Sequence, residues 1–295
     1  MCPPPDGTGL RPPPSERSIE KLLAFGVFNL DKPAGPSSHQ VSAWIRDLAG
    51  IEKAAHAGTL DPKVTGCLPV LLGDATRIAG ALLGEKSYVA VLELHDDPPA
   101  DLESVLAEFE GPIHQKPPRK SAVNRELRVR EIHELSVLDH EGRRVLLSIR
   151  CESGTYVRKL CHDLGLALGT GANMGDLRRT GTVPFDDRDL ATLHDFVDAL
   201  AVHENGDASW LREVVDPAER ALSHLPAVTI APSAAREVAN GAPVYAPGVI
   251  DADPAADGEM VACYTPGGSV VCLGRLVGHP DADSGRVVDL DAVLV

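Results

Sequence analysis

One carboxylate stands out in the stretch HAGTLDPKVTG, which spans residues 56–66. Asp61 lies between Leu60 and Pro62, and the Gly, Thr and Pro residues around it are typical of a turn rather than of a helix or strand interior. An aspartate in a turn can simply accept hydrogen bonds from nearby backbone N–H groups. It can also serve as a nucleophile that the turn presents to a substrate. The surrounding sequence has to decide between these two roles.

The elements before this turn follow from hydrophobic periodicity. FGVFNLDKP (25–33) predicts a short strand that runs into a loop. SSHQVSAWIRDLAG (37–50) predicts a helix capped by Ser37 or Ser38 and ended by Gly50, with one apolar face made of Val41, Trp44, Ile45 and Leu48. The Asp61 turn therefore follows a strand and a helix.

Two further candidate side chains lie on elements later in the chain. SYVAVLEL (87–94) predicts a strand that carries Tyr88, and RRVLLSIRC (143–151) predicts another strand. ESGTYVRKLCHDLGLALG (152–169) then predicts a turn and a helix, with Arg158 beside its apolar stripe. Taken alone, Tyr88 is an ordinary strand aromatic and Arg158 an ordinary surface charge.

The acidity of the chain is unevenly distributed. Its 295 residues have a net charge of −15, of which residues 181–295, with 6 Lys+Arg against 19 Asp+Glu, contribute −13. Such a balance counts against a nucleic-acid partner, because phosphate contacts need Lys and Arg. An acidic composition with little Lys is also typical of proteins from salt-loving cells, and here Arg outnumbers Lys by 20 to 8.

One basic segment is the exception. IHQKPPRKSAVNRELRVR (113–130) contains six Lys/Arg and one Glu, a local net charge of +5. It is either a solvated loop and strand or a phosphate-binding surface, with Lys116, Arg119 and Lys120 as the candidate contacts.

Other classes of protein find little support. The six cysteines are scattered without C-x-x-C spacing, and His, Cys and carboxylates form no recognised ligand pattern, so we expect reduced thiols and neither a metal nor another cofactor. No apolar run approaches the roughly 20 residues of a membrane span, and the Pro-rich start lacks the apolar core of a signal peptide. We therefore expect a cytoplasmic protein.

Several motifs together carry a family resemblance. FNLDKPAGPSSHQV, HAGTLDPKVTGCLPVLLGDATR, KSYVAVLEL, CESGTYVRKLCHDLG and LRRTGTVPF occur in the order and spacing of the TruB family of pseudouridine synthases, over about residues 25–190. PAVTIAPSAAREVANGAPVYAPGV resembles a PUA domain, an RNA-binding β-barrel. HQKPPRKSAVNRELRVREI is similar to the archaeal and eukaryotic, dyskerin-like branch, whose members work in H/ACA guide-RNA particles.

The resemblance implies a reaction and its catalytic residues. These enzymes break the C1′–N1 bond of uridine and join C1′ to C5 of the same base, without redox change or metal. Asp61 matches the family's aspartate, which either attacks the ribose or abstracts a sugar proton. Arg158 matches its cationic partner, which would keep the carboxylate ionised where water is excluded. Tyr88 matches the tyrosine that stacks on the target base.

The resemblance also implies residues that bind the RNA. Leu177 matches an apolar residue that packs near the base. His56 matches a histidine that fills the stack when the target nucleotide is flipped out. Lys32, in the Asp-Lys-Pro loop, is either a phosphate contact or a brace of the loop.

Substrate and partners stay open at this point. The basic segment favours a guide-RNA particle that modifies rRNA, with small particle proteins as partners. A guide-independent enzyme acting on uridine 55 of the tRNA T-arm is the nearer alternative. An inactive RNA-binding scaffold is the more distant one, although a scaffold would need none of Asp61, Tyr88 and Arg158. A metal-dependent hydrolase is a third and weaker possibility.

These observations predict the architecture. We expect a mixed α/β fold with a largely antiparallel sheet and flanking helices, followed by a small C-terminal PUA β-barrel. The expected divisions are a mobile Pro-rich extension (1–24), a catalytic domain (25–221), and a PUA domain with the C-terminal tail (222–295).

Overall fold

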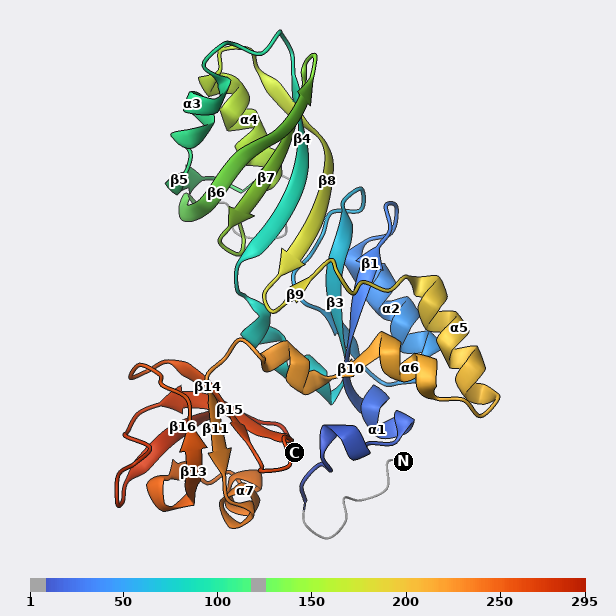
Figure 1. Ribbon diagram of the computed structural model, residues 1–295, viewed down its shortest axis with the longest axis vertical. Coiled ribbons are helices and arrows are strands. Elements are labelled where there is room, and N and C mark those ends of the chain that lie inside the picture. The colour runs from blue at the N-terminus through green and yellow to red at the C-terminus, as the bar shows by residue number, and fades with distance from the viewer. Residues whose placement is uncertain (1–8, 118–125) are drawn as a thin grey trace.

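The computed structural model describes residues 9–117 and 126–295 of the chain. In these residues the strands form two sheets, one of ten strands and one of six (Figure 1). The first sheet is largely antiparallel and has helices packed against it, and the second forms a small C-terminal domain. The predicted mixed α/β fold is therefore confirmed.

The ten-stranded sheet consists of two antiparallel halves joined in its middle. Its order is β10-β1-β3-β8-β4-β7-β6-β5, with β2 paired to β3 and β9 paired to β8. The halves meet at a short parallel contact between β3 and β8. The strands are β1 (Phe25–Lys32), β2 (Ala54–His56), β3 (Thr65–Gly73), β4 (Lys86–Leu94), β5 (Gly111–Gln115), β6 (Arg128–Glu141), β7 (Arg144–Cys151), β8 (Ala172–Thr182), β9 (Phe185–Asp186) and β10 (Val215–Pro217).

The helices cover the two halves separately. They are α1 (Ile19–Ala24), α2 (Ser38–Leu48), α3 (Leu102–Ala107), α4 (Val157–Ala167), α5 (Leu193–Glu204) and α6 (Ser209–Val214), whereas α7 (Pro232–Ala239) packs in the C-terminal domain. Short 3-10 segments span Pro14–Glu16, Asp74–Leu82, Ala218–Leu222 and Ala246–Gly248. None of the helices in the described part of the chain is long and apolar enough to cross a membrane.

Helix α2 begins as predicted but buries less than predicted. Ser37 and Gln40 form a capping box, in which each side chain accepts a hydrogen bond from the other residue's backbone N–H. Val41 is buried, as is Ile45 one turn later, whereas Trp44 and Leu48 are 46% and 47% exposed. The buried face of α2 consists of Ser38, Val41, Ser42 and Ile45, so the expected four-residue apolar face is half wrong.

Each half of the sheet has its own apolar core. The first core lies between β1, β3 and helices α2, α5 and α6, and it includes Phe28, Leu30, Val41, Ile45, Leu60, Val64, Leu68 and Phe196. The second core lies between β4, β6, β7 and helices α3 and α4, and it includes Leu92, Leu106, Leu147, Ile149, Val157, Leu160 and Leu164. Tyr88 and Leu177 pack against both cores.

The C-terminal domain is joined to the first domain by apolar packing. Its strands, in the order β12-β16-β15-β14-β11-β13, are β11 (Ala227–Ile230), β12 (Val244–Tyr245), β13 (Val249–Ala252), β14 (Met260–Tyr264), β15 (Val270–Leu276) and β16 (Arg286–Val293). Val270, Leu273 and Leu294 belong to one buried cluster with residues of β1, β3 and the 74–82 segment.

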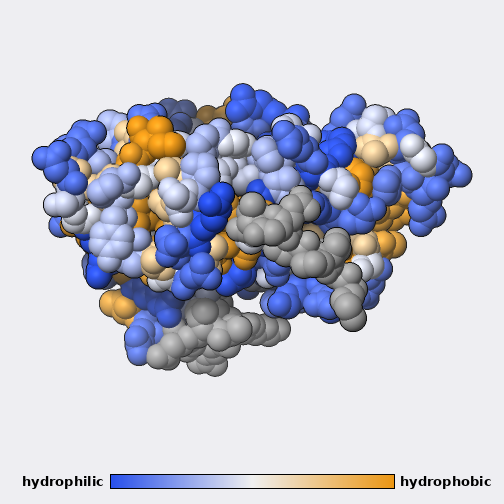
Figure 2. All heavy atoms as spheres, turned by 90° about the horizontal axis from the view of Figure 1, so that it is seen from below, coloured by the Kyte–Doolittle hydropathy of each residue, from blue (hydrophilic) through white to orange (hydrophobic). Residues whose placement is uncertain are grey.

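Figure 2, the view from below Figure 1, shows a mostly hydrophilic surface with small separate apolar patches.

The expectation of a mobile extension over residues 1–24 needs correction. Residues 9–24 pack against both domains, and residues 1–8 lie outside the described part of the chain. Arg11 Nε donates to the Leu294 carbonyl at 2.9 Å, and the Ser269 hydroxyl donates to the Pro12 carbonyl at 2.8 Å. Proline favours extended segments of this kind because its ring fixes φ and so lowers the entropy lost on docking.

A buried ion pair anchors this N-terminal segment. The Arg17 guanidinium, 1% exposed, donates to both carboxylate oxygens of Glu219 at 2.6 and 2.8 Å. Glu219 in turn accepts from the Val270 N–H at 3.1 Å. One carboxylate thus connects the N-terminal segment, the end of the first domain and strand β15.

We expect Glu219→Gln to lower the free energy of unfolding by about 3–5 kcal/mol, because the amide keeps the shape but leaves the buried guanidinium without a counter-ion. Urea unfolding measures this change. Asp47→Asn is the matched control, since the Arg46–Asp47 pair is exposed and its loss should cost less than about 1 kcal/mol. Equal effects of the two substitutions would contradict the assigned anchor.

Candidate active site

The Asp61 turn connects β2 to β3 and is held by a buried lysine. Lys32 is fully buried, and its Nζ donates to the carbonyl oxygens of Pro33 at 2.8 Å, Val64 at 2.9 Å and Pro62 at 3.1 Å. Burial lowers the pKa of this amine. A side chain so enclosed cannot reach an RNA phosphate, so Lys32 is the brace of the loop and its prediction as a phosphate contact is wrong.

Hydrogen bonds to α2 fix the turn on its other side. Leu60 N–H donates to the Ser38 hydroxyl oxygen at 2.8 Å, and that hydroxyl lies 3.0 Å from the Leu60 carbonyl. Leu60 and Val64 are buried in the first core, whereas the Asp61 side chain between them is 51% exposed. The flanking residues are therefore anchored, and the carboxylate points out of the core.

The carboxylate meets a cation from the other half of the sheet. Arg158, the second residue of α4, forms an ion pair with Asp61, and its side chain is 47% exposed. Because Leu60 belongs to the first core and Val157 to the second, this ion pair bridges the junction between them. The structure thus brings together two residues that stand 97 positions apart in the sequence.

The start of α4 is fixed by a residue that sequence analysis missed. Gln115, at the end of β5, is buried; its side chain accepts from the Tyr156 N–H at 2.9 Å and donates to the Tyr156 carbonyl at 3.3 Å. Tyr156 precedes the first residue of α4. Gln115 belongs to the basic segment 113–130, where no local pattern distinguishes a glutamine that braces the backbone from a solvated one.

Tyr88 and Leu177 lie on the central strands β4 and β8, where both side chains pack against the two cores. Tyr88 lies opposite Arg179 in the pairing of β4 with β8. Burial raises the pKa of the Tyr88 hydroxyl, and the positive charge of Arg179 partly opposes that rise. The expected aromatic and apolar candidates are therefore at the same junction as the ion pair.

His56 ends strand β2 and is partly buried. Its ring meets that of His39 edge-on, with 4.8 Å between ring centroids. Burial, aided by His39 and Arg179, lowers the pKa of His56 to about 4, so the ring is neutral at pH 7. It borders a hollow of about 370 Å³ between α2 and β2. A neutral ring suits stacking on a base better than pairing with a phosphate.

The basic segment is only partly described. Lys116 is exposed just after β5, whereas Arg119 and Lys120 lie outside the described residues. Arg130, on β6, pairs with Glu152 at 3.1 Å, a partner that the sequence analysis did not expect. Of the three candidate phosphate contacts, the structure therefore describes Lys116 alone and leaves its side chain accessible.

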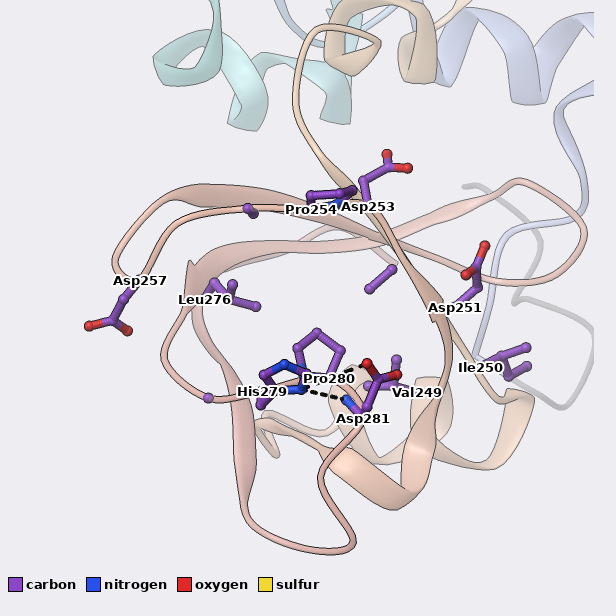
Figure 3. A pocket seen from close by; sticks show the side chains of 13 residues that line it. Val249, Ile250, Asp251, Asp253, Pro254, Asp257, Leu276, His279, Pro280 and Asp281 are labelled. Atoms are coloured by element: carbon purple, nitrogen blue, oxygen red, sulfur yellow. Dashed lines mark hydrogen bonds and ion pairs between the residues drawn. The ribbon is translucent and has the colours of Figure 1, made fainter.

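A larger hollow, of about 580 Å³, lies in the C-terminal domain between β13 and the β15–β16 loop (Figure 3). Its wall combines apolar side chains with Asp251, Asp253, Asp257 and Asp281, and the Asp281 N–H donates to His279 Nδ1 at 3.2 Å. Carboxylates repel phosphate, and none of the candidate catalytic residues lines this hollow, so we assign it no part in the site.

Among the described residues, no group of three or more His, Cys, Asp and Glu side chains could hold a metal ion. The junction itself brings together a carboxylate, a guanidinium, a phenol and apolar surface.

Four family models match successive parts of the chain. They are described as the DKCLD (NUC011) domain over residues 5–42, the TruB family pseudouridylate synthase N-terminal domain over 46–101, the tRNA pseudouridylate synthase B C-terminal domain over 158–223, and the PUA domain over 226–278.

Whole-chain relatives agree with these matches. The chain is 68% identical to the probable tRNA pseudouridine synthase B of Halobacterium salinarum, over 97% of this chain and 100% of that protein. It is 64% identical to the protein of the same name from Haloarcula marismortui, over 97% and 94%.

Solved structures show the same similarity. A Cbf5-Nop10-Gar1 complex contains a chain that matches with a TM-score of 0.91 and 45% identity, over 99% of this chain and 90% of that one. An H/ACA RNP bound to a substrate RNA containing 2′-deoxyuridine contains one that matches with a TM-score of 0.90 and 43% identity, over 97% and 90%.

The low pKa of His56 predicts a pH-dependent stability. Between its folded value of about 4 and its ordinary value near 6.5, the unfolded chain binds a proton that the folded chain excludes, so this residue makes unfolding easier as the pH falls. We expect His56→Asn to remove part of the wild-type loss of unfolding free energy between pH 6.5 and 4.5, measured by urea unfolding. His140→Asn, an exposed change on β6, is the control. Identical pH slopes for wild type and His56→Asn would contradict the assigned environment.

Proposed function

This chain belongs to the TruB family of pseudouridine synthases, and on that premise we propose that it isomerises uridine in RNA to pseudouridine with Asp61 as the nucleophile. The observation that carries the assignment of Asp61 is its ion pair with Arg158 at the junction of the two cores. Its loop is fixed by buried contacts on both sides, so the carboxylate is held in place before RNA binds.

The arrangement suits a reaction that only exchanges bonds. The C1′–N1 bond of uridine breaks, a C1′–C5 bond forms, N1 gains a proton and C5 loses one. Asp61 remains ionised beside Arg158, so it is able to act on the ribose and hold it while the uracil turns. RNA bound over the Asp61–Arg158 ion pair would exclude water from it, and this would strengthen the attraction between the two charges.

The side chains around the pair would receive the flipped nucleotide. Tyr88 offers an aromatic face and Leu177 an apolar surface on the adjacent strands, and both stand at the edge of the cores rather than inside one. His56 is neutral and would occupy the space that the flipped base leaves in the RNA stack.

We propose that the RNA is chosen with the help of a guide. The support is the match to chains from a Cbf5-Nop10-Gar1 complex and from an H/ACA RNP bound to substrate RNA, together with the basic segment 113–130. Small proteins of the Nop10 and Gar1 kind would then be partners. The names of the curated relatives favour tRNA as a further substrate.

Recovery of the protein from its own cells, followed by sequencing of the bound RNA, tests this choice. Guide RNAs with rRNA targets would support the particle. Bound tRNA alone would support the guide-independent enzyme.

The domain division follows from the two sheets. We propose a catalytic domain over residues 25–221 and an RNA-binding PUA domain over 222–295, with residues 9–24 as a segment that joins them. The acidic composition and the salt-loving sources of the two relatives support a cytoplasm of high salt as the setting.

We expect Asp61→Asn to abolish pseudouridine formation while RNA affinity stays within about twofold, because an amide has the same size but is neither nucleophile nor base. Tritium release from RNA labelled at C5 of uridine reports the reaction, and filter binding reports the affinity. Wild-type rates in the variant would refute the proposed function.

We expect Arg158→Ala to separate stability from catalysis. Both members of the pair are half exposed without RNA, so the free energy of unfolding should fall by less than about 1 kcal/mol. Under bound RNA the same change leaves a desolvated carboxylate without a partner, so the single-turnover rate should fall about a hundredfold or more. A rate loss below about threefold would make Arg158 an ordinary surface charge.

A further inference from the structure

The hollow of about 370 Å³ between α2 and β2 is large enough to hold a ligand. Helix α2 contributes His39, Ser42, Ala43 and Arg46 to its wall, and β2 contributes all of its residues, Ala54–His56. Its volume lies within the range of about 300–1,000 Å³ that is typical of small-molecule sites. The short alanine side chains keep the space between the two histidines and the arginine open.

This hollow is joined to the Asp61 turn by direct hydrogen bonds. Ser38, which precedes His39 on α2, contacts the Leu60 N–H at 2.8 Å and the Leu60 carbonyl at 3.0 Å through its hydroxyl. Leu60 directly precedes Asp61, and on the other wall β2 ends at His56, where the chain enters the turn. An RNA strand that places a uridine over Asp61 would therefore place a neighbouring nucleotide near the hollow.

The charge of the wall suits a nucleotide. Among the described residues, those that line this hollow include a guanidinium and two imidazoles but no carboxylate, whereas four aspartates line the larger hollow of the C-terminal domain. Arg46 pairs with Asp47, but the two side chains are 43% and 64% exposed, so a phosphate can compete for the guanidinium. In a chain with a net charge of −15, such a wall favours an anionic ligand.

Two histidine rings offer surfaces on which a base can stack. The rings of His39 and His56 meet at 90°, with 4.8 Å between centroids, and in such a pair the ring that presents its edge keeps both of its faces uncovered by the other. The Nδ1 atom of His56 is buried without a hydrogen-bond partner in the described part of the chain. A buried polar atom of this kind costs free energy until a ligand or a rearrangement supplies a partner.

We propose that this hollow is a subsite for one nucleotide of the substrate RNA, a direct neighbour of the target uridine, with its base against the two histidine rings and its phosphate toward Arg46. This inference rests on the proposed function. It extends the role of His56, because a ring that takes the place of the flipped uridine contacts the neighbouring base on one of its faces.

Ala43→Phe tests the subsite by filling it. Ala43 is half-buried and lines the hollow, so a phenyl ring there would take the space of the base. We expect the RNA affinity to fall at least fivefold, since stacking of one base is worth a factor of about 5–150. Filter binding on a synthetic copy of the RNA recovered with the protein from its own cells measures this loss. Leu48→Phe is the matched control, because Leu48 is exposed on the same helix outside the hollow, and its affinity should stay within about twofold.

An abasic nucleotide next to the target uridine identifies the occupant. At one of the two neighbouring positions, 5′ or 3′, it should lower the wild-type affinity at least fivefold but leave that of Ala43→Phe within about twofold, because the filled hollow already excludes the missing base. A purely structural effect of Ala43→Phe would instead add to the abasic effect at both positions, and this result would overturn the proposal. Equal RNA affinities of wild type and Ala43→Phe would do the same.

If urea unfolding shows that Ala43→Phe does not fold, His39→Ala makes the same test. His39 is exposed, so its truncation opens no cavity in the core, and it removes one of the two stacking surfaces. An abasic effect as large in His39→Ala as in wild type would overturn the proposal.

The outcomes also distinguish this inference from the function on which it rests. Wild-type RNA affinity in Ala43→Phe together with an inactive Asp61→Asn would refute the subsite and leave the function intact. An active Asp61→Asn would refute the function itself.

Discussion

Two buried cations hold the Asp61 turn by its backbone oxygens, and the rest of the candidate site depends on this interaction. A turn that leaves a sheet exposes carbonyls that no strand partner satisfies, and buried carbonyls need donors. Lys32 donates to the carbonyls of Pro62 and Val64 from one side, and Arg179 donates to those of Ala57 and Gly58 from the other. Because the cations have left water already, their hydrogen bonds are strong and directional. The turn is therefore rigid where it must place a carboxylate.

The division of the sheet into two cores explains where that carboxylate is placed. Each half can pack on its own helices, and the strand pairing that joins them is the short contact of β3 with β8. Side chains at this junction, such as Tyr88 and Leu177, touch both cores without being enclosed by either. A packed interior admits no substrate, but a boundary between two packed interiors offers rigid walls and open space. Asp61 reaches this boundary from one half and Arg158 from the other.

The sequence predicts well those features that depend on residues close together in the chain. The strand of β1, the capping box of α2 and the alternating burial of β7 follow from residues a few positions apart. The Asp61–Arg158 contact was accessible only through family resemblance, since no local rule connects residues 97 positions apart. Trp44 and Gln115 show the opposite failures. The spacing of Trp44 predicts that it is buried, but its side chain is 46% exposed. Gln115 is buried because it is hydrogen-bonded to the backbone of Tyr156, which lies 41 residues away and which no local pattern indicates.

The same buried cations bear on how an acidic chain can hold RNA. Lys32 and Arg179 are enclosed and bonded to backbone oxygens, and Arg130 and Arg178 pair with Glu152 and Asp31. These charges organise the protein and are not available to phosphates. Phosphate attraction therefore has to come from other cations, such as the exposed Lys53, Lys63, Arg77 and Lys116, or from partner proteins. In high salt such attraction weakens, because each counter-ion gains less entropy when it is released into a concentrated solution. Shape complementarity and base stacking then contribute more to recognition, and both depend on a rigid protein surface of the kind that the buried cations provide.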